Sequence, residues 1–245
     1  MVHKTKGLVL RAVKYGETSL IVTAFTELFG TQSYIVNGVR TASKQSTGKA
    51  SHFQPAAMLD MVVYHNQFVN LQRIKEYKWA HLYQHLFSSV RKNSVALFMV
   101  ELLSKCLREP EANAELFYFV EDAFLHLDEA SEKVTANFSL YFALHLAVFF
   151  GFRINDEFST EQSFLDFREG MFVPAQPEHP YFLEGKLAEA TSQVLKAQRP
   201  EELEDLSLSG DTRRRILATL EDYYRLHIPE FTPLKTLPIL REVLS

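Results

Sequence analysis

The sequence is poor in cysteine, since Cys106 is the one cysteine among 245 residues. This excludes an internal disulfide framework and a structural zinc site made of cysteines alone, and it fits a reducing compartment. Long apolar runs are also missing. The longest covers residues 138–152, is interrupted by His145 and is shorter than the roughly 20 residues that span a bilayer. The first residues carry charges inside a short apolar run, unlike a secretion signal. We therefore interpret residues 138–152 as a buried helix and expect a soluble, cytoplasmic protein.

Several catalytic signatures are absent as well. The sequence has neither the G-x-S-x-G of a nucleophile elbow nor the glycine pattern of a dinucleotide-binding fold. The run S-T-G-K at 46–49 resembles part of a phosphate-binding loop. However, Ser43 stands where that motif requires its first glycine, and Ala50 stands where it requires Ser or Thr. Cys106 lies among apolar residues at helical spacing, which favours core packing over catalysis. The pattern therefore argues against an NTPase.

One pair of histidines has a spacing that suits a metal ion. His81 and His85 are four residues apart, so both would lie on one face of a helix. No glutamate completes an H-E-x-x-H motif and no third ligand is obvious, so we favour a partly exposed helix over a metal site. A metal-dependent hydrolase built on this pair is the weakest of the functional alternatives.

The charges that are present are unevenly distributed. The formal net charge is -4, but residues 1–80 hold ten basic and four acidic residues, whereas the remainder holds 16 basic and 26 acidic residues. The excess of cations in the first part can attract a polyanion such as nucleic acid. The rest of the chain cannot do so by bulk charge.

The first 80 residues contain five short runs of β-branched and aromatic residues, with Gly or Asn near several of their ends. This pattern predicts strands over 7–13, 20–25, 33–39, 57–64 and 68–74. Gly30 can adopt a positive φ and so suits a tight hairpin between the second and third strands. Because five antiparallel strands leave a long open edge unless the sheet closes, we predict a five-stranded barrel of the OB type.

From residue 77 onward the apolar pattern becomes helical. Residues 132–150 are apolar nearly all round, which places that helix at the centre of a bundle. Gly170 and three prolines break up residues 152–182. The predicted fold is thus α+β and multidomain, with an OB-fold nucleic-acid-binding domain over 1–80 and a helical domain over 81–245 that includes an irregular segment at about 152–182. The predicted helices cover about 95–107, 116–127, 132–150, 183–197 and 211–227.

The segment between the third and fourth predicted strands carries three cations, Arg40, Lys44 and Lys49. Phosphate is the simplest partner for such a loop. OB barrels bind single strands with a basic groove and aromatic stacking platforms. For each aromatic residue of this barrel, however, packing in the interior is the simpler interpretation. The candidate platforms are Tyr15, Phe25, Phe29, Tyr34, Phe53, Tyr64 and Phe68.

Two separated stretches of the sequence resemble the RecO recombination mediator family. The first consists of G-L-V-L-R at 7–11, Y-G-E-T-S-L-I-V-T-A-F-T at 15–26, F-G at 29–30 and N-G-V-R at 37–40, followed by the polar loop. The second, R-R-R-I-L-A-T-L-E-D-Y-Y-R-L-H-I-P-E-F-T-P-L-K-T-L-P-I-L at 213–240, is similar to the closing helices of that family. The middle of the chain is also similar, through F-F-G-F-R-I at 149–154 and F-L-D-F-R-E-G-M-F at 164–172.

The resemblance implies a bacterial, cytoplasmic, nucleoid-associated protein without enzymatic turnover. Members of the family bind single- and double-stranded DNA without sequence specificity and anneal complementary strands. They also bind the acidic tail of the single-stranded DNA-binding protein SSB and, with RecR, help load RecA onto SSB-coated strands. Many members carry four cysteines as a structural zinc site after the segment that matches residues 149–154. This sequence has no cysteine there, so we expect no zinc knuckle, no metal and no other cofactor.

The resemblance also suggests which residues contact DNA. Arg40 matches the family's G-x-R after the third strand and is the first candidate. Lys44, Lys49, Arg11 and Lys14 follow from charge and loop position alone. A mediator must hold the DNA backbone without reading sequence, so contacts from Lys and Arg to phosphates should dominate. The alternative function is an OB-fold protein-interaction adaptor that contacts DNA only incidentally.

Overall fold

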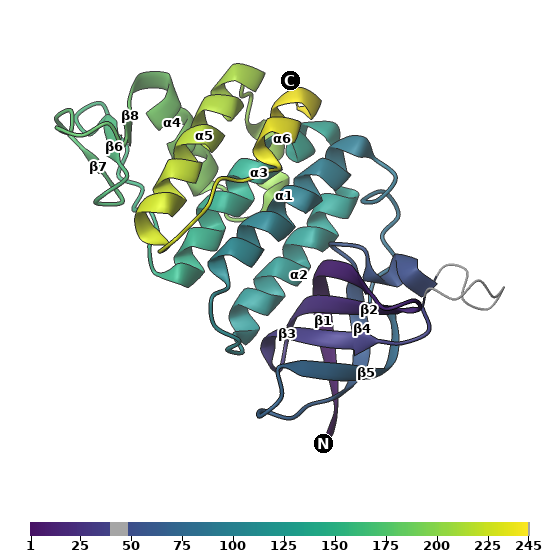
Figure 1. Cartoon of the computed structure of the whole chain (residues 1–245). Helices are drawn as coiled ribbons and strands as arrows, with labels where there is room; N and C mark the ends of the chain where they lie inside the picture. The colour runs from purple at the N-terminus through teal and green to yellow at the C-terminus, as the bar shows by residue number, and fades with distance from the viewer. Residues whose placement is uncertain (40–48, 245) are drawn as a thin grey trace. The chain divides into compact units, whose positions relative to one another are not determined.

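The computed structural model describes residues 1–39 and 49–244, apart from the side chain of Lys49. A closed five-stranded barrel is followed by a helical region and a small sheet (Figure 1). The chain forms two compact units, one of residues 1–83 with 107–124 and the other of residues 84–106 with 125–245. The predicted domain boundary after residue 80 stays a prediction.

The barrel has the strand order β1-β2-β3-β5-β4. Neighbouring strands are antiparallel, except that β3 and β5 run parallel. The closed order with five strands confirms the predicted OB-type barrel. The elements of this part are β1 (Val2–Tyr15), β2 (Ser19–Thr26), β3 (Gly30–Val36), the short helix η1 (Lys49–Phe53), β4 (Met58–Tyr64) and β5 (Leu71–Trp79).

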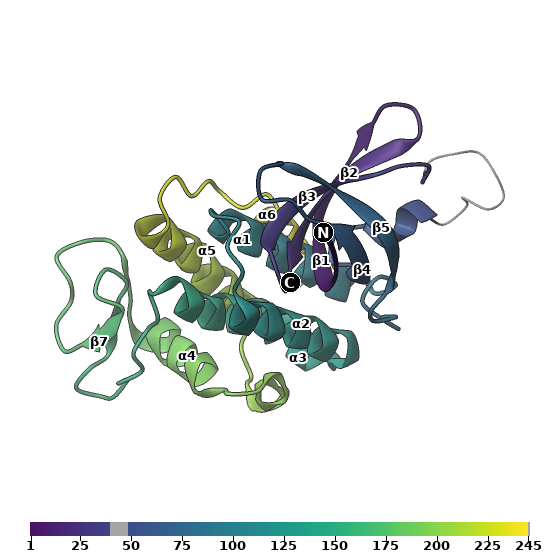
Figure 2. The same ribbon diagram turned by 90° about the horizontal axis from the view of Figure 1, so that it is seen from below.

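The strand β1 is longer than the sequence pattern predicts, because it serves two neighbours in turn. Its first half, from Val2 to Leu8, pairs with β4, and its second half pairs with β2. The register shifts between Val9 and Arg11, and such a bulge bends a strand and increases its twist. This bend allows a small sheet to close on itself. Figure 2 shows the hairpin β1–β2 extending beyond the other strands.

The helical region is built around α3 (Glu132–Leu146), which continues as the short helix η2 (Ala147–Phe150). The stretch from Glu132 to Phe150 is long and apolar enough to cross a membrane by length and composition, but 67% of its most apolar window is buried inside the fold. It is therefore the core helix that the sequence predicts. Around it pack α1 (Val90–Cys106), α4 (Gly185–Lys196), η3 (Pro200–Asp205) and α5 (Gly210–His227).

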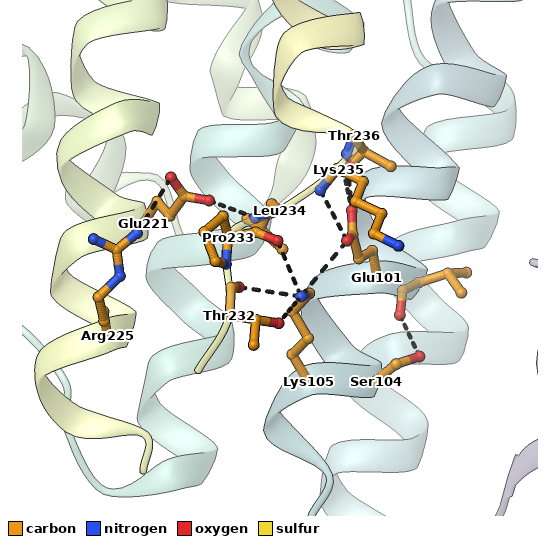
Figure 3. A network of polar contacts seen from close by, with 11 residues as sticks. Glu101, Ser104, Lys105, Glu221, Arg225, Thr232, Pro233, Leu234, Lys235 and Thr236 are labelled. Atoms are coloured by element: carbon orange, nitrogen blue, oxygen red, sulfur yellow. Dashed lines mark hydrogen bonds and ion pairs between the residues drawn. The ribbon is translucent and has the colours of Figure 1, made fainter. Parts of the chain in front are cut away.

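The other two helices are α2 (Ala114–Glu129), most of which belongs to the compact unit of the barrel, and α6 (Leu237–Val243). The sequence pattern did not predict α6, which has only seven residues. Contacts from α1 fix the chain just before it (Figure 3). The Glu101 carboxylate accepts hydrogen bonds from the backbone N–H groups of Lys235 and Thr236, both at 2.9 Å, and Lys105 Nζ donates to the carbonyl of Pro233 at 3.1 Å. A helix this short is not stable alone, so these tertiary contacts decide that it forms.

The segment predicted to be irregular contains a small sheet of three short strands. Its order is β7 (Met171–Val173), β6 (Phe164–Asp166), β8 (Phe182–Leu183). Aromatic packing anchors the sheet to α5, because the ring of His227 stacks on Phe152 with centroids 5.0 Å apart and its Nε2 lies 3.0 Å from the carbonyl of Phe167. Among the described residues, no three His, Cys, Asp or Glu side chains lie together as possible metal ligands.

His145 in α3 makes the stability of the fold sensitive to acid. Burial lowers the pKa of its imidazole, although a hydrogen bond with the backbone of Ala197 acts in the opposite direction. Its Nε2 is buried and has no hydrogen-bond partner among the described residues. Because the unfolded chain keeps the ordinary pKa of about 6.5, it binds more protons than the folded chain as the pH falls through that value. The contribution to stability is therefore present above that pH and is lost below it.

We expect His145→Phe to lose less unfolding free energy than the wild type when the pH is lowered from about 7.5 to about 5.5. Urea denaturation at both pH values measures the difference. The unfolding free energies of the two proteins at the higher pH show whether the phenylalanine ring is tolerated in the core. If both proteins lose the same free energy on acidification, protonation of His145 does not limit the acid stability.

Candidate nucleic-acid interface

The outer surface of β1, β2, β3 and β5 carries two rows of side chains that the strand register lines up. Arg11 is paired with Thr23, Thr23 with Ser33, and Ser33 with Leu71. In the second row, Val13 is paired with Ile21, Ile21 with Ile35, and Ile35 with Arg73. All eight side chains of the two rows are exposed or half-buried. The alternate residues Val22, Tyr34 and Gln72 point inward and are buried. We call the eight outward residues the β2–β3 face: Arg11, Val13, Ile21, Thr23, Ser33, Ile35, Leu71 and Arg73.

The β2–β3 face combines positive charge with aliphatic and hydroxyl groups. None of its eight members is acidic. Arg11 and Arg73 are exposed, and neither has an ion-pair partner among the residues that the structure describes. Guanidinium groups without a carboxylate neighbour are available for phosphate oxygens, which they bind bidentately. Ile21 and Ile35 lie side by side at the centre and offer an apolar floor for sugars or bases.

The outer surface of β1, β4 and β5 differs, because two of its lysines, Lys6 and Lys78, already have acidic partners. Lys78 Nζ lies 3.4 Å from Asp60, and Lys6 Nζ lies 2.7 Å from Glu121. The hydrogen bond that Lys6 donates to Glu121 raises the pKa of the Lys6 ammonium, although partial burial opposes the shift. Each of these cations would have to give up a carboxylate to bind a phosphate. The two arginines of the β2–β3 face are therefore more accessible to a phosphate than Lys6 and Lys78 are.

The structure separates two of the predicted DNA-binding residues. Arg11 and Lys14 are three positions apart on β1, and successive side chains of a strand alternate between its faces. Arg11 belongs to the β2–β3 face, whereas Lys14 shares the opposite face with its neighbour Leu20 on β2. Lys14 is exposed because it lies near the tip of the hairpin β1–β2. One extended strand of DNA lying on the β2–β3 face would contact Arg11 and not Lys14.

The other predicted residues belong to the segment between β3 and β4. Arg40 and Lys44 lie outside the residues that the structure describes. Lys49 is the first residue of η1, and its side chain is not described. Their contact with DNA stays a prediction.

The seven candidate aromatic residues divide into three groups by their burial. Phe25, Tyr34 and Phe53 are buried in the core and cannot stack on a base. Phe29 is half-buried, and its ring stacks on that of His65 at 3.9 Å. The other three are exposed: Tyr15 by 51%, Tyr64 by 46% and Phe68 by 85%.

Sequence reasoning missed Arg73 and misplaced Phe68. The fifth strand was predicted from Phe68, but β5 begins at Leu71, so Phe68 lies in the loop between β4 and β5. Asn66 explains the difference, because its side-chain oxygen accepts the backbone N–H of Phe68 at 3.0 Å, a turn that competes with strand pairing. Arg73 was counted as basic but not chosen. The sequence indicated that Arg73 lies on the same side of its strand as Leu71, two residues before it. Only the pairing of β5 with β3 shows that this side belongs to the face that also carries Ser33 and Ile35.

The histidine pair does not form the predicted arrangement. Residues 80–89 contain no helix, and α1 begins at Val90. His81 Nε2 lies 2.8 Å from Glu121, whereas His85 donates its backbone N–H to Asp128 at 2.8 Å. The two residues are therefore bound by different carboxylates, His81 through its ring and His85 through its backbone, and the predicted shared helix face was wrong.

Comparison with known proteins agrees with this architecture. The family profile described as "Recombination protein O N terminal" matches residues 1–83, and the profile "Recombination protein O C terminal" matches residues 88–238. The chain belongs to the RecO family. A DNA repair protein RecO from Phocaeicola vulgatus is 35% identical over 245 residues, which cover 100% of each chain. The RecO proteins of Bacteroides fragilis and Flavobacterium psychrophilum are 32% and 33% identical and cover 99% of each chain.

Membership of the RecO family confirms the resemblance seen in the sequence. It identifies the chain as a DNA repair protein, and the barrel is the OB-type amino-terminal part of that family. The β2–β3 face lies on the OB-type barrel of this DNA repair protein and carries no acidic residue. Its two arginines have no ion-pair partner among the described residues. It is therefore the leading candidate for a nucleic-acid interface.

Proposed function

We propose that the β2–β3 face binds the backbone of single-stranded DNA without reading its sequence. The observation that carries this proposal is the pair of exposed arginines, Arg11 and Arg73, on a face without acidic residues, where neither has an acidic partner in the described ranges. They lie at opposite corners of the two rows, with the hydroxyls of Thr23 and Ser33 between them. Arginine contacts to successive phosphates would hold an extended strand across β1, β2, β3 and β5.

On this basis we propose that the protein acts as a recombination mediator rather than as an enzyme. It would bind single- and double-stranded DNA, anneal complementary strands and act in the bacterial cytoplasm at the nucleoid. Annealing needs two negatively charged strands to approach each other, and neutralising one strand on the β2–β3 face lowers their repulsion. RecR, the acidic tail of SSB and, indirectly, RecA are the proposed protein partners, as in the family.

The loop that joins β3 to β4 extends the proposal. Arg40, Lys44 and Lys49 lie between β3 and β4 in the sequence, and Val39, the residue before Arg40, is buried in the core at one end of the loop. Together with Arg11 and Arg73 they form the proposed phosphate-binding set. Lys14 belongs to it only if DNA also contacts the second face of the hairpin β1–β2.

Fluorescence anisotropy of a labelled oligothymidylate tests the proposal. We expect Arg11→Ala/Arg73→Ala to bind more weakly and to show a shallower dependence of log affinity on log salt, by about 0.7 for each phosphate that the variant no longer neutralises. Lys78→Ala is the matched control, because it removes a cation whose partner is Asp60 on another face. That variant should bind as the wild type does.

A parallel variant, Arg40→Ala/Lys44→Ala/Lys49→Ala, measures the contribution of the loop in the same assay. If this variant loses affinity and the double arginine variant does not, the DNA lies on the loop and the β2–β3 face is not the interface. If the wild type itself binds no DNA, the protein-interaction adaptor becomes the better description. Circular dichroism of each variant checks that it is folded.

A further inference from the structure

Phe68 is unusually exposed for a large apolar side chain, at 85% of its surface. Single exposed apolar residues are common on proteins and need no explanation by themselves. An explanation is needed when the surrounding structure holds the ring in one place, because a loop without a function can turn such a side chain toward the core and gain free energy from its burial.

A buried glutamine holds the loop that carries Phe68. Gln72 is 4% exposed, and its Oε1 accepts the backbone N–H of Asn66 at 3.1 Å. Its Nε2 donates to the carbonyls of Asn66, at 2.8 Å, and of Val69. Asn66 in turn accepts the N–H of Phe68 through its side chain at 3.0 Å. These bonds span the loop from both sides of Phe68, so the backbone that carries the exposed ring is braced.

The start of the loop is also attached to the rest of the barrel. His65 exchanges backbone hydrogen bonds with Met1, at 3.0 and 3.2 Å, and its ring stacks on Phe29. The loop is therefore fixed at its first residue, across its middle and at the start of β5. A partner that binds the ring therefore does not have to order the loop backbone, which lowers the entropic cost of binding.

The chemistry around Phe68 suits a nucleobase. Residues 61–75 contain no carboxylate, and the loop offers the side-chain amides of Asn66, Gln67 and Asn70. Arg73, on the β2–β3 face, follows five residues later at the start of the adjoining strand β5. An aromatic ring stacks on any base that is free of its partner, and amides can bond to base edges without strong sequence preference. In a duplex the bases are already stacked and paired, so the ring has nothing to stack on.

We propose that Phe68 is a base-stacking platform that gives the interface its preference for single-stranded over double-stranded DNA. This inference rests on the proposed function, because the phosphates of the same strand would lie on the β2–β3 face. The arginines then supply affinity for any DNA backbone, and Phe68 supplies the part of the affinity that requires unpaired bases.

The test compares three labelled probes of equal length: an oligothymidylate, an oligonucleotide with abasic residues in place of the bases, and a duplex. We expect Phe68→Ala to bind the oligothymidylate about five- to 150-fold more weakly, the range for one base–aromatic stack. Its binding to the abasic strand and to the duplex should equal that of the wild type, and its salt slope should not change. Phe68→Trp should keep the affinity of the wild type for the oligothymidylate.

Val69→Ala is the matched control, because Val69 is the neighbouring exposed apolar side chain of the same loop, at 45%. It should leave all three affinities unchanged. Equal losses by Phe68→Ala on the abasic and the base-containing strand would overturn the inference, as would no loss at all. If the wild type binds none of the probes, the proposed function fails and this inference fails with it. That result would favour Phe68 as a contact for a protein partner.

Discussion

Gly30→Ala is expected to be the most damaging small substitution in the barrel, with a loss of at least about 3 kcal/mol of unfolding free energy. Gly30 opens β3 with a φ of 61°, a conformation that residues with a side chain rarely adopt. A Cβ atom at this position would also lie 2.2 Å from the carbonyl oxygen of Glu111 and 2.9 Å from the carbonyl carbon of Pro110. Both groups are backbone, so the overlap is relieved only by moving the chain that leads into α2.

Gly16→Ala separates the two causes. Gly16 lies in the turn between β1 and β2 with a φ of 57°, nearly the same as that of Gly30, but a Cβ added there would have no atom of the described residues within 4 Å. Its replacement should cost only the unfavourable conformation, about 1–2 kcal/mol. Urea denaturation of the two variants measures the difference. Equal losses would mean that the segment around Glu111 moves away without cost and that Gly30 is required for its φ alone.

Asp128→Ala should destabilise the helical region by about 3 kcal/mol or more. Asp128 lies near the end of α2 and is 7% exposed. Its carboxylate accepts three consecutive backbone N–H groups, those of Gln84 at 2.8 Å, His85 at 2.8 Å and Leu86 at 2.6 Å. Alanine leaves these donors without partners, and Leu86 is completely buried, so water cannot replace the missing bond there.

The backbone of Asp128 adds to its role, because its carbonyl accepts the buried ammonium of Lys92 on α1 at 2.6 Å. Alanine keeps that bond, so the expected loss comes from the carboxylate. Asp128→Asn keeps one acceptor oxygen and should lose less than the alanine variant. Asp222→Ala is the control, since Asp222 makes an exposed ion pair with Arg225 at 3.0 Å and should cost about 0.5 kcal/mol or less. Thermal and urea unfolding of the three variants decide the order. A loss for Asp128→Ala no larger than that for Asp222→Ala would contradict the prediction.

The sequence predictions that the structure confirmed rest on patterns of residues that are close together in the chain. The alternation of apolar residues and the glycine at position 30 are local properties, and they were sufficient to predict the strands and their closure into a barrel. The apolar residues on all sides of residues 132–150 likewise predicted the central helix. Bounds shifted where a side chain competed with strand or helix formation, as that of Asn66 does ahead of β5, in the loop that Gln72 of β5 also binds.

Predictions failed where they assumed a conformation that the local pattern did not require. The spacing of His81 and His85 was interpreted on a helix, but Glu121 and Asp128, which are distant in sequence, bind that segment and leave it without a helix. In the same way, α6 depends on Glu101 and Lys105 of α1, which hold the chain before it. No periodicity within a short window reports such contacts.

The sequence by itself determined the family, the OB-type barrel, the helical region and the excess of positive charge in the first 80 residues. Only the tertiary structure decided which of those charges act together. The register across four strands places Arg11 and Arg73 on one face, although they are 62 positions apart by number, and puts Lys14 on the other face. It also decided that Lys6 and Lys78 have acidic partners and that Phe68 is exposed to solvent. The physical reason is that composition and period are local properties of the chain, whereas the pairing of a charge depends on the strand or helix that packs beside it.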